Sequence, residues 1–115
     1  MADASGLVGR TIAEMRDGLN KREFSGVDLA QAHIEAAEAA RPLNAYITET
    51  ARTALDRAFF SDTRRAQGAV GPMSGLPLAV KVLFCTRDVV TTAGSHILEG
   101  ATPKYESTRT EAHTA

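Results

Sequence analysis

A single charged residue interrupts an otherwise apolar run near the middle of the chain. The run reads SGLPLAVKVLF over residues 74–84, and Lys81 is the only residue of its last seven that is not apolar. Gly75 and Pro77 mark its start, which is typical of a core strand, although a short buried helix has the same composition. Alternation along a strand would place Lys81 on the face opposite to its two valine neighbours. The run predicts a buried strand that carries a lysine.

The environment of Lys81 decides what this residue can do. On a half-covered strand it would point to solvent, where most lysines lie, because a charged side chain is rarely buried without a partner. On a covered face, desolvation disfavours the ammonium, and a lysine held toward its neutral form can act as a general base for a hydroxyl nucleophile. The residues alone leave both alternatives open.

Several segments carry a resemblance to a known family. SGLPLAVK and the later TTAGSHIL at residues 91–98 resemble the start of the amidase signature family, and within it the A subunit of the glutamyl-tRNA(Gln)/aspartyl-tRNA(Asn) amidotransferase. LNAYI at residues 43–47, GPMSGLP at 71–77 and PKYEST at 103–108 agree with that protein. The resemblance runs from about residue 11 to residue 108.

The resemblance implies a catalytic triad of serine, cis-serine and lysine, and it assigns the lysine to Lys81. Both serines belong to a glycine- and serine-rich stretch further downstream, and the 115 residues contain no such stretch. Thr91, Thr92, Gly94 and Ser95 match the family's TTAGS segment, a structural piece close to the active site whose hydroxyls are candidate supporting donors. A turn capped by Thr and Ser is the alternative for these four residues.

An intact relative is implied to be a glutaminase. Its serine attacks the side-chain amide of glutamine, and the B subunit uses the released ammonia, with ATP and magnesium, to amidate mischarged Glu-tRNA(Gln) or Asp-tRNA(Asn). The C subunit clamps the other two together. The chain itself is expected to hold no cofactor or metal and, without both serines, to be inactive alone. An amidase of small amides and a non-catalytic helical assembly module remain as alternatives.

Two departures from the family pattern stand out. The family's lysine is usually followed by aspartate, and Val82 in that place supplies no carboxylate that could position Lys81. The family runs on after PKYEST into an amphipathic helix, whereas residues 109–115 read RTEAHTA and have no apolar stripe. We therefore expect residues 109–115 to be an atypical tail, as a truncated, frameshifted or fragmentary gene would produce.

Composition excludes several classes of function. A net charge of -1 gives no basic field, so no direct binding to nucleic acid or to an anionic membrane is expected. No apolar stretch is long enough for a transmembrane helix, and the first residues do not resemble a secretory signal. Cys85 is the single cysteine and is expected to be an inert buried thiol. These features predict a cytoplasmic protein.

Local patterns predict three helices before the lysine-bearing run. They cover residues 12–19, 27–40 and 51–65, with a break at Arg41 and Pro42. The first two begin at capping patterns, Thr11 with Glu14 and Ser25 with Asp28, and Gly68 is the expected C-cap of the third. Phe59 and Phe60 are predicted to lie in the core. The fold class is therefore α/β, with helices followed by the first strands of an α/β/α fold with a mixed sheet. Residues 1–115 would form one partial domain, in which residues 1–10 are expected to be flexible.

Overall fold

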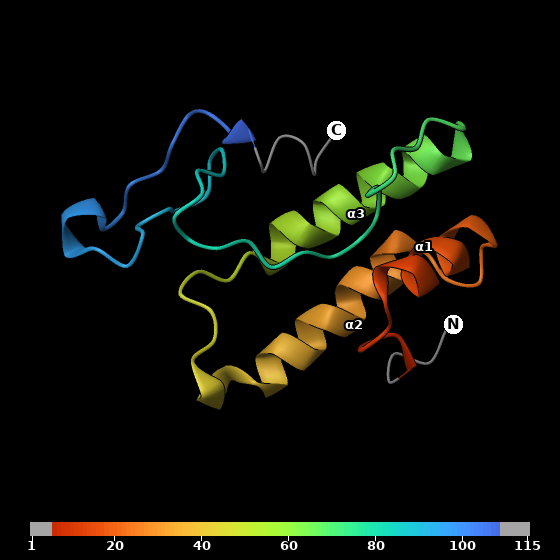
Figure 1. Cartoon of the computed structure of the whole chain (residues 1–115), viewed down its shortest axis with the longest axis horizontal. Helices are drawn as coiled ribbons and strands as arrows, with labels where there is room; N and C mark the ends of the chain where they lie inside the picture. Colours follow the sequence, from red (N-terminus) through yellow and green to blue (C-terminus); the bar gives the residue numbers. More distant parts are fainter. Residues whose placement is uncertain (1–5, 109–115) are drawn as a thin grey trace.

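Three α-helices form the ordered centre of the molecule in the computed structural model, which describes residues 6–108 (Figure 1). The helices and the two short 3-10 helices have the bounds α1 Ile12–Asn20, α2 Gly26–Ala39, η2 Arg41–Leu43, α3 Ala51–Ala66 and η3 His96–Leu98. The three predicted helices are confirmed to within two residues at each end. None of the described helices is long and apolar enough to cross a bilayer.

Reciprocal side-chain caps start the first two helices. The Thr11 hydroxyl accepts from the Glu14 amide at 3.1 Å, and the Glu14 carboxylate accepts from the Thr11 amide at 2.8 Å. Ser25 and Asp28 repeat this arrangement at the start of α2, at 3.0 and 2.9 Å. Each pair satisfies two backbone N–H groups that have no partner within the helix. Short sequence patterns therefore fix where both helices begin.

The ends of the later helices also follow local rules. Helix α2 stops at Arg41 and Pro42, where the chain tightens into η2 and Asn44 takes a left-handed conformation with φ of 52°. Helix α3 ends before Gly68, whose φ of 77° is left-handed and whose amide donates to the Arg65 carbonyl at 3.1 Å. Glycine adopts this conformation without the cost that a Cβ atom imposes. The predicted break and the predicted glycine cap are both confirmed.

The buried core lies between α1, α2 and the segment that precedes α1. Its members are Leu7, Met15, Leu19, Phe24, Leu29 and Ala32, with Leu76 packed against them. The Phe24 ring lies directly over Gly18, because a Cβ atom there would come within 2.2 Å of the ring. Leu7 is 2% exposed and belongs to this core, whereas the other residues of 6–10 are exposed, and the flexibility expected for residues 1–10 stays a prediction. Residues 1–5 and 109–115 lie outside the described part of the chain.

A carboxylate on α3 joins that helix to the start of α2. Asp62 accepts hydrogen bonds from the Gly26 amide at 2.8 Å and from the Val27 amide at 3.1 Å. Gly26 permits this approach, because a Cβ atom there would lie 2.9 Å from the Asp62 carboxylate. The negative charge lies at the positive end of the α2 dipole, which adds to the hydrogen bonds. The side chains of Asp62, Ser25 and Asp28 together accept hydrogen bonds from the backbone N–H groups at the start of α2.

Two expectations from the sequence are wrong. Residues 78–84 form no strand: the chain is irregular up to Lys81 and then turns, with the Phe84 amide donating to the Lys81 carbonyl at 3.0 Å. A strand requires a neighbouring backbone, and no described segment lies in register beside this one. Phe59 and Phe60 are 68% and 63% exposed and so are not core residues. The sheet of the predicted α/β fold is not formed within residues 6–108 and stays a prediction.

Candidate functional site

The last turn of α3 holds the loop that leads toward Lys81. The Arg65 guanidinium donates through Nη1 to the Asn20 side chain at 2.6 Å and through Nη2 to the Ser74 carbonyl at 3.0 Å. The Ser74 hydroxyl in turn accepts from the Gly71 amide at 2.9 Å. Arg65 thus links the end of α1, α3 and the loop. Sequence reasoning missed this role, because the helix dipole alone explains a cation in the last turn.

The loop meets the helical core at its next two residues. Gly75 has a left-handed φ of 82°, and a Cβ atom there would lie 3.3 Å from Leu19 and 3.4 Å from the Ser61 hydroxyl. Leu76 follows and packs against the buried core. The left-handed conformation therefore favours glycine here, and a Cβ atom would be in tight contact with the Leu19 side chain. The chain leaves the helical scaffold directly after Leu76, five positions before Lys81.

Lys81 itself is open to solvent. Its side chain is exposed, and its ammonium has no hydrogen-bond or ion-pair partner among residues 6–108. The neighbouring Val80 and Leu83 are 47% and 48% exposed, so this segment lacks the apolar cover that its sequence predicts. The prediction of an enclosed lysine near a small-residue pocket is wrong for this structure. The catalytic role of Lys81 is a separate prediction, which exposure alone does not decide.

After Lys81 the chain runs out and back as two paired arms, residues 85–91 and 101–107. Three backbone hydrogen bonds link the arms at 2.8 to 2.9 Å, from Ser107 to Cys85, from Asp88 to Pro103 and from Thr91 to Ala101. The two residue numbers joined by each bond add up to nearly the same total, which is the pattern of two antiparallel segments. The bonds are too widely spaced to make regular strands.

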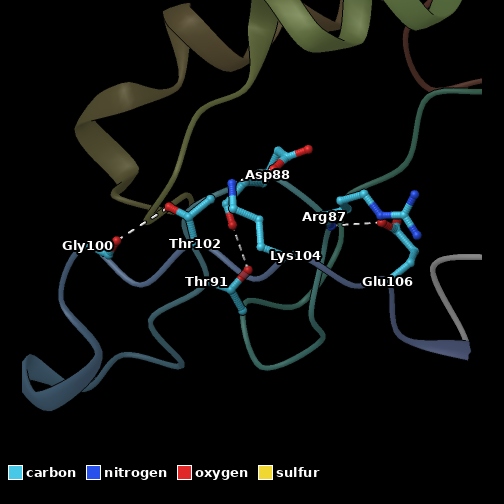
Figure 2. Close-up of polar contacts among 8 residues, drawn as sticks. Arg87, Asp88, Thr91, Gly100, Thr102, Lys104 and Glu106 are labelled. Carbon is cyan, nitrogen blue, oxygen red and sulfur yellow. Dashed lines mark hydrogen bonds and ion pairs between the residues drawn. The ribbon is translucent and has the colours of Figure 1, made fainter.

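Side chains add further contacts between the same two arms, and Figure 2 shows two of them. The Lys104 ammonium lies 3.0 Å from the Asp88 carboxylate, and the Glu106 carboxylate accepts from the Arg87 amide at 2.7 Å. Cys85 lies 3.3 Å from the Tyr105 hydroxyl and is half-buried rather than fully enclosed. The hydrogen bond with Cys85, and the charge of that thiol once ionised, raise the pKa of Tyr105.

The four candidate supporting residues lie together where the arms meet the connecting loop. The Thr91 hydroxyl donates to the Val89 carbonyl at 3.0 Å, and the Thr92 hydroxyl accepts from the Gly94 amide at 3.2 Å. The Ser95 hydroxyl accepts from the Ile97 amide at 3.2 Å and starts η3. All three hydroxyls are thus engaged in local turns, as the alternative interpretation of this segment predicts.

The structure brings these four residues together but does not connect them to Lys81. No hydrogen bond or ion pair joins the lysine side chain to the TTAGS residues in the described part of the chain. The described residues also contain no group of His, Cys, Asp or Glu arranged to hold a metal ion. Residues 6–108 therefore provide an exposed lysine, a hydroxyl-rich turn and a loop held by Arg65, and no described side-chain contact joins the lysine to the turn.

Comparison with known proteins gives these elements a context. The profile of the amidase family matches residues 28–113. The A subunit of the glutamyl-tRNA(Gln) amidotransferase of Paramagnetospirillum magneticum is 57% identical over 104 residues, which is 90% of this chain and 21% of that protein. The protein of the same name from Caulobacter vibrioides is 58% identical over 104 residues, with the same coverage. That from Methylocella silvestris is 52% identical over 102 residues.

The chain therefore spans about a fifth of the length of these relatives, in which it corresponds to the N-terminal region. No solved structure matches it.

Proposed function

The chain belongs to the amidase family, and we propose that it supplies the lysine-bearing N-terminal region of the A subunit of a tRNA-dependent amidotransferase. The observation that carries this proposal is the ordered set SGLPLAVK and TTAGS within a stretch that is 57% identical to one such protein. In this proposal Lys81 is the proton-transferring base, and the hydroxyl-rich turn at Thr91, Thr92, Gly94 and Ser95 supports the site.

The proposed reaction is hydrolysis of the side-chain amide of glutamine. A serine oxygen attacks the amide carbon, and its proton passes through the cis-serine to the lysine. The carbon–nitrogen bond then breaks, the lysine returns the proton to the leaving nitrogen, and ammonia departs. Water next attacks the acyl ester and releases glutamate. Lys81 supplies only the base, whereas acyl transfer also needs a nucleophile and donors for the oxyanion.

Two neighbouring segments of this region differ in their contacts with the helices. Arg65, Gly75 and Leu76 fix the loop before Lys81 to the helices, while Lys81 and its neighbours remain uncovered. An anchored segment with an uncovered end suits a lysine that completes its site against another part of a larger domain. We propose that in an intact relative this contact desolvates Lys81, and that the B and C subunits of the amidotransferase bind the assembled protein.

The isolated 115-residue chain tests the first part of the proposal. We expect it to release no ammonia from glutamine, asparagine or small amides above a buffer control. A chimera should carry residues 1–108 joined to the downstream part of the Paramagnetospirillum protein, whose N-terminal part is 57% identical. We expect this chimera to recover glutaminase activity, at least in part.

Variants of that chimera then test the role of Lys81. Lys81→Met should lower kcat by a factor of about 100 or more, because the base is lost. Lys104→Met is the matched control, because Lys104 is an exposed lysine whose partner is Asp88, and it should leave activity unchanged. Val82→Asp should raise activity by restoring the family's carboxylate. Equal activity of the Lys81→Met and Lys104→Met chimeras would contradict the proposal.

A non-catalytic assembly module is the second candidate, and the helical core favours it. Helices α1 and α2 enclose Leu19 and Leu29 almost completely, so the region has a packing role that does not need Lys81. Amide hydrolysis by the isolated chain that disappears in Ser95→Ala would contradict both candidates, because the nucleophile would then be local. A chimera that assembles and hydrolyses glutamine without Lys81 would favour the module.

A further inference from the structure

The outward face of α3 carries two aromatic side chains that nothing in the described structure covers. Ala58 is buried and faces α2, whereas Phe59 and Phe60 are 68% and 63% exposed. Helix periodicity explains the difference, because the two positions after Ala58 rotate away from α2. Two adjacent exposed phenylalanines on an otherwise polar helix face require a physical explanation.

The residues around these phenylalanines resemble a protein interface more than a domain interior. Asp56 and Arg57 are exposed on the same side of the helix, and the Arg64 guanidinium lies over the Phe60 ring, 5.9 Å from its centre. Charged residues are rarely buried within a domain. Aromatic residues and arginine are, by contrast, the types enriched in interfaces and in their energetic hot spots. The face therefore fits the surface of another protein molecule.

The order of charges along α3 identifies which molecule fits. Asp56 precedes Phe60 by four residues and Arg64 follows it by four, so each lies about 6 Å from Phe60 along the helix axis. Residues four apart share one side of a helix. A two-fold axis through Phe60 therefore places Asp56 of each copy beside Arg64 of the other, with the two Phe60 rings in contact between them.

We propose that the outward face of α3, defined by Asp56, Phe59, Phe60 and Arg64, is a self-association surface on which two copies of this chain pair with antiparallel helices. The pairing is self-complementary, as an interface with two-fold symmetry requires. It buries four phenylalanines and joins two pairs of opposite charges. One helix pair is smaller than the roughly 1,600 Å² of a standard stable interface, so the dimer is weak and depends on concentration.

Sedimentation equilibrium of the full chain over a wide range of concentrations tests this proposal. We expect a reversible monomer–dimer equilibrium that Phe60→Ser weakens by about tenfold or more. Ile97→Ser is the matched control, because Ile97 is 94% exposed in η3, far along the chain from α3, and it should leave the equilibrium unchanged. Far-UV circular dichroism should show the same helix content in both variants.

Charge reversal distinguishes a second copy from any other occupant. Asp56→Arg alone and Arg64→Asp alone each place like charges together and should weaken the dimer, more so at low salt. The double variant restores opposite charges across the two-fold axis and should recover dimer formation. A chain that is monomeric at every concentration overturns the proposal. A dimer that is insensitive to Phe60→Ser, or single reversals that the double variant does not rescue, also overturns it.

Discussion

The part of the chain up to Leu76 and the part after it differ in how their backbone groups form hydrogen bonds. In residues 6–76, three helices close their backbone hydrogen bonds within each segment, and apolar side chains from α1, α2 and the segments that flank them meet in one core. In residues 77–107, the only regular element is the 3-10 helix η3, and the large apolar residues are mostly exposed. Figure 1 shows this contrast as a helical cluster from which the later chain runs out as loops.

The difference follows from the range over which each structure finds its partners. A helix bonds to residues four positions away, and short caps such as Thr11 with Glu14 complete its ends. A buried strand such as the one predicted around Lys81 needs backbone partners on its sides and cover on both faces. Residues 6–108 meet the first requirement in their helices, whereas the segment around Lys81 does not meet the second. The paired arms, residues 85–91 and 101–107, are the nearest approach to a sheet.

Truncating a leucine in each part should give the largest difference in the free energy of unfolding. Leu29 is completely buried, so Leu29→Ala should lower the free energy of unfolding by about 2–5 kcal/mol. Leu83 is 48% exposed, so Leu83→Ala should change it by less than about 0.5 kcal/mol. Urea denaturation followed by far-UV circular dichroism measures both values. A loss at Leu83 as large as that at Leu29 would mean that the later part is packed in solution.

Replacing a carboxylate in each part should give a smaller difference in stability, with the larger loss again in the helical part. Asp62 accepts two backbone hydrogen bonds at the start of α2, so Asp62→Asn should cost about 1–2 kcal/mol, because the new amide group cannot accept both. Asp88 forms an exposed ion pair with Lys104, so Asp88→Asn should cost only about 0–1 kcal/mol. The same denaturation measurement compares the two variants. Equal costs would contradict the role of Asp62 as the link between α2 and α3.

Local sequence patterns were sufficient for the helices. The two capping pairs, the Arg41–Pro42 break and Gly68 each act over fewer than five residues, and all four appear in the structure as predicted. The family resemblance was likewise visible in short segments, and the comparisons confirm it. Features of this kind can be predicted because their physical causes lie within the pattern itself.

Contacts between distant residues could not be predicted in the same way. Asp62 lies 36 positions from Gly26, and the only local signal was a glycine at the first position of a helix. Phe59 was assigned to the core because it continues the spacing of Ala51 and Ala58, but the packed face of α3 is too narrow to include it. Around Lys81, the apolar sequence predicts burial, but no described residue covers this side chain.

The connection between α2 and α3 sharpens the comparison further, because it belongs to the helical part but is as exposed as the later loops. The Arg41 guanidinium donates to the Glu49 carboxylate from Nε at 3.1 and 3.3 Å and from Nη2 at 2.9 Å, and both side chains are exposed. The hydrogen bond from Arg41 is the main reason that the pKa of Glu49 lies below its ordinary value. Arg41→Met should therefore raise the pKa of Glu49, which an NMR titration of the side-chain carboxyl can measure.

The same pair fixes the sign of a small dependence of stability on pH. A lowered pKa means that the folded chain binds the Glu49 proton less tightly than the unfolded chain does. The contribution of the pair is thus present at neutral pH and disappears as the pH falls through the titration of this carboxylate. Arg16→Met is the control, because the nearest carboxylate to Arg16 is that of Asp17 at 3.9 Å, and it should leave Glu49 unchanged. If Arg41→Met does not move the Glu49 titration, the connection is open in solution and resembles the later loops rather than the helices that it joins.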